Sequence, residues 1–200
     1  MPCNPFPFKP TGNKMPKILV LAASLRPGSL NSALADIVAH ACAEGGAEVT
    51  RLNPADYEMP IYTTLEEEQS GLPQAALALH AQFRGHDGIF IASPEYNAFP
   101  APLLVNWLTW LSRVTDHGGK PAAFEVPVFA IGSASPGGFG GYRGLMALRN
   151  QLELAFGARV LPAMVSIANA QAAIGAGTLQ DPRAQQMCEM MVAKLLEAAA

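Results

Sequence analysis

Hydroxyl, amide and guanidinium side chains are concentrated in a short segment between residues 24 and 32. Together they offer several hydrogen-bond donors and one fixed positive charge, which is the chemistry that a phosphate monoester requires. The candidate phosphate-binding residues are Ser24, Arg26, Ser29, Asn31 and Ser32. The simpler alternative is that Ser29 only caps a following helix and that Arg26 is a solvated surface charge.

A second polar segment, residues 93–97, combines a rigid proline, a flat aromatic ring and an amide. Such a segment is suited to line the edge of a flat ring such as isoalloxazine and to cover its face. The candidate ring-binding residues are Pro94, Glu95, Tyr96 and Asn97. The alternative interpretation is an ordinary turn with a buried tyrosine.

A third segment, residues 132–141, is rich in glycine and serine. It is not a dinucleotide-binding fingerprint, because Arg143 stands where the third glycine would follow Gly138 and Gly140. The chain has no Gly-Lys-Ser/Thr phosphate loop either, which argues against a nucleoside triphosphatase. Glycine backbone can still approach a flat ring closely, and the candidate residues are Ser133, Ser135, Gly137 and Gly138. A plain mobile connection is the alternative.

Each of these segments follows a short apolar run that is typical of a buried strand and precedes a helical pattern of apolar residues. The three runs span residues 18–22, 89–92 and 126–131. Strands alternating with helices predict an α/β fold, a flavodoxin-like three-layer sandwich. We expect a five-stranded parallel sheet in the order 2-1-3-4-5 with helices on both faces. The ends of strands 1, 3 and 4 then meet at the switch point of the sheet, so the polar segments form one site.

The remaining elements follow from the same patterns. Strands are expected at 47–52 and, as a last strand, at 159–161 with 164–167, and helices at 75–84 and 182–198. Residues 53–72 are expected to form a long loop. The helix over 102–112 has apolar residues on more than one stripe, which predicts that it faces a partner subunit as well as its own sheet.

Length and composition exclude several classes of protein. The 200 residues suit one domain, predicted at 17–200, and the proline-rich residues 1–16 are expected to be a flexible N-terminal tail. A net charge of −3 without a cluster of Lys and Arg indicates no nucleic-acid partner. No apolar run is long enough to cross a membrane. Charged residues make up only 14% of the chain, which favours a surface covered partly by another subunit.

The cysteines and histidines give no metal-ligand pattern. The three cysteines lie too far apart in sequence for a metal knuckle or a Cys-x-x-Cys pair, which predicts a reduced, cytoplasmic protein. The four histidines do not pair at helical spacing, so we expect them to be partly exposed surface residues. No metal is predicted.

Taken together, the three segments resemble the motifs of the NADPH-dependent FMN reductase family, and the likeness extends from residue 17 to the final helix. The first motif, Ser-x-Arg-x-x-Ser-x-Asn, stands at 24–31, the second, Pro-Glu-Tyr-Asn, at 94–97, and the third at 133–138. The chain departs from the family at Phe99, Val105 and Thr109, where members usually have Ser, Lys and Asp. These departures make the rim of the expected ring site more apolar.

The resemblance implies FMN as the bound cofactor, with the first motif on its phosphate and the other two on its ring. It also implies NADPH or NADH as the hydride donor, and a small-molecule electron acceptor such as a quinone or free flavin. Members are homodimers or homotetramers, and Tyr96 is a candidate contact residue. The flavin carries the chemistry in such a protein, so no catalytic acid, base or nucleophile is assigned.

Two other functions are compatible with the sequence. One is a flavin-binding electron carrier or redox sensor that is not an enzyme. The other is a flavin-free protein that binds or hydrolyses a phosphate ester.

Overall fold

The computed structural model describes residues 15–175 and 177–200, and its centre is a parallel sheet. The strand order is β2-β1-β3-β6, with β7 and β8 both beside β6. The bounds are β1 Lys17–Ala22, β2 Glu48–Arg51, β3 Gly88–Ala92, β6 Val128–Ala134, β7 Arg159–Val160 and β8 Val165–Ile167. The predicted fold class is confirmed. The fifth strand position is shared by two short strands, because the chain leaves the sheet around Pro162, which has no N–H to donate.

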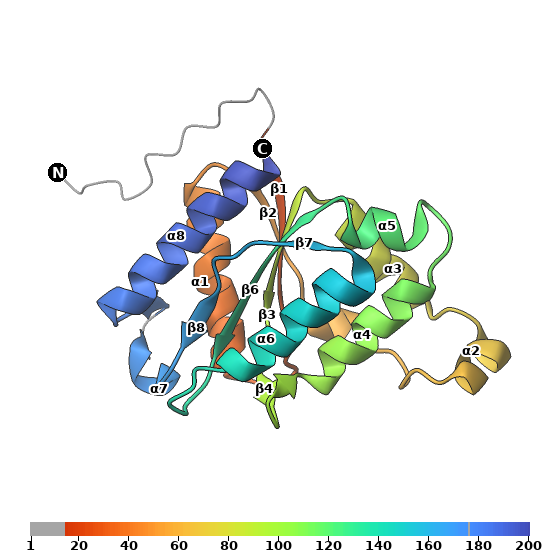
Figure 1. Cartoon of the computed structure of the whole chain (residues 1–200), viewed down its shortest axis with the longest axis horizontal. Coiled ribbons are helices and arrows are strands. Elements are labelled where there is room, and N and C mark those ends of the chain that lie inside the picture. The colour runs from red at the N-terminus through yellow and green to blue at the C-terminus, as the bar shows by residue number, and fades with distance from the viewer. Residues whose placement is uncertain (1–14, 176) are drawn as a thin grey trace.

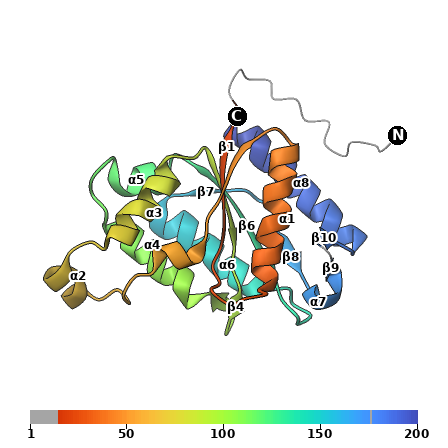
Figure 2. The same cartoon turned by 180° about the vertical axis from the view of Figure 1, so that it is seen from behind.

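Alternate residues of each central strand face opposite layers, and both layers are apolar. Ile18, Val20 and Phe90 face α1 (Leu30–Glu44) and α8 (Pro182–Ala199). Leu19, Leu21 and Ile89 face the opposite layer. That layer consists of α3 (Gln74–Arg84), α4 (Pro102–Arg113), α5 (Gly119–Phe124) and α6 (Tyr142–Asn150), the last extended by a π-helical turn, Gln151–Ala155. Figures 1 and 2 show the sheet between the two layers of helices.

Several small elements were not expected from the sequence. They are the hairpin of β4 (Glu95–Tyr96) with β5 (Phe99–Pro100), the hairpin of β9 (Ile174–Gly175) with β10 (Thr178–Leu179), and the short helices α5 and α7 (Ala170–Ala173). The prediction of a long loop over 53–72 is wrong in part. This segment contains a 3₁₀ turn, Pro54–Tyr57, and helix α2, Thr64–Ser70, which stands apart from the body of the molecule in Figure 1. Thr63 caps α2 by accepting a hydrogen bond from the N–H of Glu66.

The second apolar stripe of α4 is covered by the same chain. The indole N–H of Trp107 donates to the carbonyl of Tyr57 at 2.9 Å, and that of Trp110 donates to the carbonyl of Pro60 at 2.8 Å. Both tryptophans are buried in the single chain. The stripe that predicted a subunit contact is therefore explained by the segment 57–62, which packs on α4 and satisfies its polar atoms.

Three of the four histidines, His40, His86 and His117, are exposed or partly exposed as expected, and His80 is the exception. His80 is buried, and its Nε2 has a polar partner there, since it lies 2.8 Å from the carbonyl oxygen of Gly119 at the start of α5. Cys42 and Cys188 are free and buried between α1 and α8. Burial, with a smaller contribution from a neighbouring charge, raises the pKa of each thiol to about 12.

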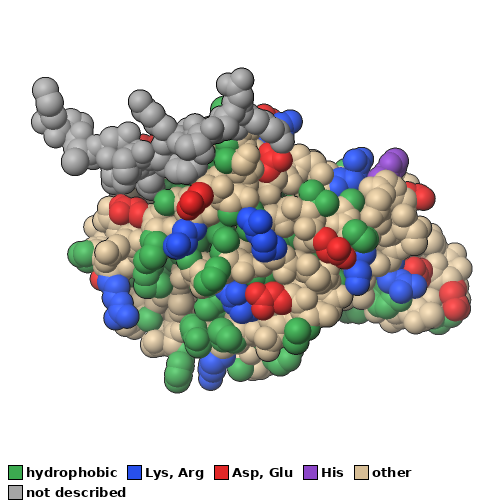
Figure 3. Space-filling view, turned by 45° about the horizontal axis from the view of Figure 1, so that its top comes forward, with side chains coloured by type: hydrophobic (Ala, Val, Ile, Leu, Met, Phe, Trp, Pro, Cys, Tyr) green, Lys and Arg blue, Asp and Glu red, His purple; other side chains and the backbone are tan. Residues whose placement is uncertain are grey.

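The expected tail, 1–16, lies outside the described residues except for Met15 and Pro16. Pro16 already belongs to the fold, since its carbonyl accepts a hydrogen bond from the N–H of Glu48 at 3.0 Å. Within the described ranges, no helix combines the length and apolarity needed to cross a lipid bilayer. On the face drawn in Figure 3, positive and negative side chains of the described residues are interspersed, without a stripe of one sign.

Candidate functional site

The three predicted segments meet at one edge of the sheet, the lower edge in Figure 1. β1 is the strand at which the chain order reverses, since β2 lies on one side of it and β3 on the other. The segments that follow β1, β3 and β6 are held together by backbone hydrogen bonds, from Ala23 N–H to the Ala92 carbonyl and from Ser93 N–H to the Gly132 carbonyl, both 2.9 Å. This is the position at which open α/β sheets bind ligands.

Asn31 links the first segment to the third. Its amide nitrogen donates to the carbonyl of Ala134 at 2.9 Å, and its amide oxygen accepts from the N–H of the same residue at 3.0 Å. The side chain is 4% exposed. Asn31, predicted from the sequence as a phosphate ligand, thus fixes the start of α1 against the end of β6.

The first segment forms an open start to α1. Ser29 is the N-cap residue, and its hydroxyl accepts from the N–H of Ser32 at 3.4 Å. The N–H groups of the first two helical residues point out of the helix start, as they do in any α-helix. A hollow of about 330 Å³ beside this start is lined in part by Ser24, Arg26 and Ser32. Arg26 is exposed and has no ion-pair partner among the described residues.

The second segment forms the β4–β5 hairpin. Asn97 and Ala98 occupy its two-residue turn with φ of 53° and 64°, the left-handed conformation that tight hairpin turns need. The side chain of Tyr96 is half exposed. Pro94 connects the hairpin to β3, and the Ser93 hydroxyl accepts from the N–H of Ala101 at 3.2 Å. The hairpin therefore presents Tyr96 and Asn97 on the outside of the fold.

Glu95 points into the protein instead. One carboxylate oxygen pairs with the guanidinium of Arg143, and the other accepts from the N–H of Gly144 at 3.0 Å. Burial by itself raises the pKa of this carboxyl. The hydrogen bond from Gly144 and the pairing with Arg143 lower it more, so the pKa lies below its usual value.

The third segment begins later than predicted, because Ser133 belongs to β6. Its hydroxyl is fully buried against the backbone of Gly141 and has no hydrogen-bond partner among the described residues. Ser135 stays in the segment, where its hydroxyl accepts from the N–H of Gly137 at 3.2 Å. Gly138 is exposed, and a Cβ built on it would meet no atom within 4 Å. Backbone groups here are open to a ligand.

Helices α1, α4 and α6 start at this edge, and the starts of α1 and α6 differ in whether an acidic side chain already occupies them. The start of α6 already holds the carboxylate of Glu95 on Gly144 N–H. The first turn of α1 contains no acidic residue, and its cap is a neutral serine. Helix starts favour negative charge, so the start of α1 is open to an anion, whereas the start of α6 is already occupied by a carboxylate.

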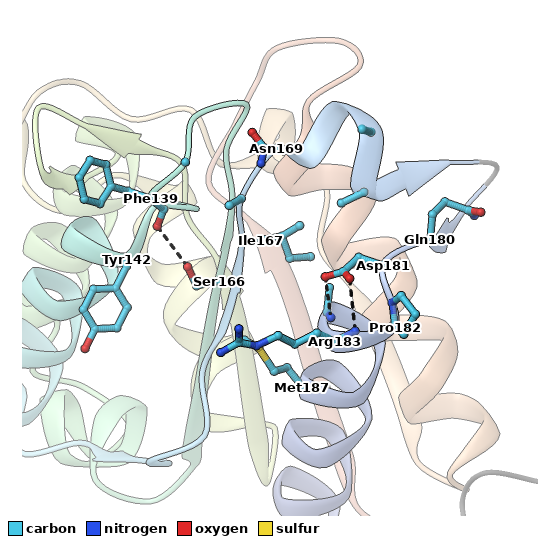
Figure 4. A pocket seen from close by; sticks show the side chains of 15 residues that line it. Phe139, Tyr142, Ser166, Ile167, Asn169, Gln180, Asp181, Pro182, Arg183 and Met187 are labelled. Atoms are coloured by element: carbon cyan, nitrogen blue, oxygen red, sulfur yellow. Dashed lines mark hydrogen bonds between the residues drawn. The ribbon is translucent and has the colours of Figure 1, made fainter.

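Two hollows flank the site. A groove of about 550 Å³ runs beside the β4–β5 hairpin, and no charged residue lines it: its walls are Ile61, Tyr62, Tyr96, Asn97, Phe99, Pro100, Pro102, Val105, Asn106 and Thr109. A larger cavity of about 870 Å³ lies on the other side of the third segment, between α6, β8 and α8. In Figure 4 the guanidinium of Arg183 extends from α8 toward the wall that carries Ser166 and Tyr142.

The sequence predicted which residues lie at this edge, but it did not predict which of their side chains face outward. Outward-facing groups are Ser24, Arg26, Ser32, Tyr96, Asn97, Gly137 and Gly138. Asn31, Glu95 and Ser133 are turned inward and hold segments together or pack between them. Arg143 and Gly144 were missed as partners of Glu95, and no local sequence signal marks them.

A parallel flavodoxin-like sheet with an open helix start and two exposed loops at its switch point is the arrangement of the doubly wound α/β proteins that bind nucleotide-like ligands at this edge. The sequence matches the NADPH-dependent FMN reductase family over residues 16–172. The chain belongs to this family, which confirms the resemblance drawn from the motifs.

Individual relatives agree with this assignment. An NAD(P)H-dependent FMN reductase from Pseudomonas aeruginosa is 32% identical over 183 residues, which cover 90% of this chain and 92% of that protein. A quinone reductase from Escherichia coli K12 is 33% identical over 117 residues, 58% of this chain. That match spans only 61% of the length of the quinone reductase.

Solved structures show the same fold. A flavoenzyme NAD(P)H:(acceptor) oxidoreductase from Paracoccus denitrificans superposes with a TM-score of 0.74 and 23% sequence identity. The superposition covers 92% of this chain and 97% of that one.

The contact between Ser133 and Gly141 makes a testable prediction. Gly141 has φ of 79°, and a Cβ at this position would overlap the buried hydroxyl of Ser133. We expect Gly141→Ala to lower the free energy of unfolding by about 2 kcal/mol or more, because it adds both strain and overlap. Urea unfolding measures this.

Gly138→Ala is the matched control in the same segment, since a Cβ there meets open space. We expect it to change the free energy of unfolding by less than about 1 kcal/mol. Equal losses in the two variants would contradict the packing described for Ser133 and Gly141.

Proposed function

We propose that the protein is an FMN-dependent NAD(P)H oxidoreductase that passes electrons to a small acceptor such as a quinone or free flavin. The observation that carries the proposal is the meeting, at one switch point, of an open anion site on α1 with the exposed loops after β3 and β6. FMN, when bound, accepts hydride from the nicotinamide and delivers electrons to the second substrate. FMN and NADPH are also the molecules that the family name contains.

The phosphate of FMN is assigned to the start of α1. Arg26 supplies a fixed positive charge with planar donors, and the hydroxyls of Ser24, Ser29 and Ser32 lie along the same turn. Backbone N–H groups at the helix start add to this field. Asn31 takes part through Ala134, which keeps the phosphate segment in register with the ring segment.

The ring is assigned to the two other segments. Pro94, Tyr96 and Asn97 bring a rigid backbone, a half-exposed aromatic ring and an amide to one side. Ser135, Gly137 and Gly138 bring a backbone with little side-chain bulk to the other. These residues bind and orient, and none is assigned as an acid, base or nucleophile. The proposed class of electron acceptor is inferred from the names of the relatives, quinone reductase and NAD(P)H-dependent FMN reductase.

A second copy of the chain is the proposed occupant of the groove beside the hairpin. Ile61, Phe99 and Tyr96 are 82%, 64% and 54% exposed there, and the groove has no charged wall. Large exposed apolar side chains gathered in one place mark an interaction surface. The departures at Phe99, Val105 and Thr109 fall on this groove, so they act on the contact surface as well as on the rim of the ring site.

Anaerobic mixing tests the proposed activity. We expect the purified protein to bind FMN, and NADPH or NADH to bleach the visible absorbance of the bound flavin. A quinone added afterwards should restore the absorbance, because electrons return to the acceptor.

Other outcomes separate the alternatives. Bound FMN that neither nicotinamide bleaches would indicate an electron carrier or redox sensor. A colourless protein that cannot be loaded with FMN would contradict every flavin-dependent function.

Arg26 offers a direct test of the phosphate assignment. We expect Arg26→Ala to weaken FMN binding by about 1 to 3 kcal/mol, because it removes a charge-assisted contact. Titration of the apoprotein with FMN, followed by flavin fluorescence, measures the affinity. Arg84→Ala is the control, since Arg84 is exposed in the last turn of α3. An unchanged affinity in Arg26→Ala would refute the role of Arg26.

Sedimentation velocity tests self-association through the groove. We expect the wild-type protein to sediment as a dimer or larger species, and Phe99→Lys to shift it toward the monomer, because the contact would bury a charge. Leu154→Lys is the control, since Leu154 is 84% exposed in the turn after α6, outside the groove. A monomeric wild-type protein at micromolar concentration would overturn this assignment.

A further inference from the structure

The carboxylate of Glu95 connects two segments that are 48 to 49 residues apart in sequence. Its first oxygen pairs with the Nε of Arg143 at 2.9 Å and with a terminal guanidinium nitrogen of the same residue. Its second oxygen accepts from the backbone N–H of Gly144 at 3.0 Å. Gly144 is the third residue of α6, so Glu95 caps this helix from another part of the chain.

The aliphatic part of the Glu95 side chain packs against Gly144 at the same contact. A Cβ built on Gly144 would lie 3.1 to 3.2 Å from the Cγ and Cβ of Glu95, and 3.0 Å from the carbonyl oxygen of Phe99. A side chain at this position would push the β4–β5 hairpin away from α6 by a few tenths of an ångström, so the glycine permits the close approach. The hairpin and the start of α6 are therefore in contact through backbone as well as through charge.

Arg143 carries the contact on into the third segment. Its guanidinium carbon lies 4.6 Å from the centre of the Phe139 ring, a cation–π distance. Phe139 belongs to the third segment, in which Gly137 and Gly138 are proposed to contact the flavin ring. Glu95 of the second segment is thus linked directly to the first turn of α6, and through Arg143 to Phe139 of the third segment.

The carboxylate of Glu95 is already engaged within the protein. Both oxygens are occupied, and the side chain is 9% exposed although Arg143 is half exposed. Leaving this carboxylate without its partners would be costly, because an unpaired charge would remain in a buried place.

We propose that Glu95 is a positioning residue: it holds the hairpin, the start of α6 and the third segment as one unit, and so shapes the flavin-ring site without touching the flavin. The inference deepens the proposed function and rests on it for the part that concerns FMN. Its mechanical part, the coupling of the two loops, concerns the protein alone.

Amide hydrogen exchange of the apoprotein tests the mechanical part. We expect Glu95→Gln to speed exchange over residues 136–146, because the charged cap of α6 is lost. Arg143→Gln should speed exchange over the same residues through the same contact. Glu153→Gln is the matched control: it breaks the ion pair with Arg149, 2.9 Å in the structure, at the other end of this helical segment. We expect no change over 136–146 in the control.

FMN titration tests the part that concerns the cofactor. We expect Glu95→Gln and Arg143→Gln each to raise the dissociation constant of FMN about tenfold, and the double variant to raise it no further, since both remove one contact. The absorption spectrum of bound FMN should stay as in the wild type. Glu153→Gln should bind FMN like the wild type.

Each contrary result overturns the proposal. A weaker affinity in Glu95→Gln with an altered flavin spectrum, beside an unchanged affinity in Arg143→Gln, would make Glu95 a direct ligand. Unchanged exchange over 136–146 in both variants would show that the contact does not hold the loops. A wild-type protein that binds no FMN would refute the proposed function, and the exchange comparison would still decide the coupling.

Discussion

Burial of a parallel sheet on both faces is the constraint on which the rest of the structure depends. Side chains from β1 and β3 alternate between two apolar layers, and each layer is complete only when helices cover it. Helices that return the chain to the same side bring every strand end to one edge. The polar segments after β1, β3 and β6 meet there because the core requires that path. The site is therefore a consequence of how the sheet is buried.

Polar contacts then decide how the segments at this edge are used. Buried polar groups must be paired. Two side chains at this edge form such pairs over long sequence distances: the Asn31 amide with Ala134, and the Glu95 carboxylate with Gly144 and Arg143. Both pairs join segments that belong to different strands. The carboxylate also fills the start of α6, which leaves the start of α1 for an anion. This difference between the two helix starts is the reason for proposing the FMN phosphate at α1 and the ring at the other two segments.

Much of the fold was predictable, since strands 18–22 and 89–92 and the helices after them are clear in the apolar pattern. The predicted loop over 53–72 was wrong in part because α2 is polar and is identified by its Thr63 cap instead of by apolar periodicity. The two-stripe pattern of α4 was read correctly as burial on two sides. Its second cover turned out to be Tyr57 and Pro60 of the same chain, which no periodicity reveals.

The sequence by itself determined the main strands and helices and the residue types at the candidate site, because strand runs, helix periodicity and motifs each lie within a short stretch of sequence. Tertiary structure alone decided which motif residues face outward. Asn31 meets Ala134 across 103 positions, and Glu95 meets Gly144 across 49. Local sequence patterns cannot predict such pairings. The pairings form only when helices pack on both faces of the sheet and bring distant backbone groups within hydrogen-bond distance. Packing thus divides the motif residues into those that face outward and those that hold the three segments together.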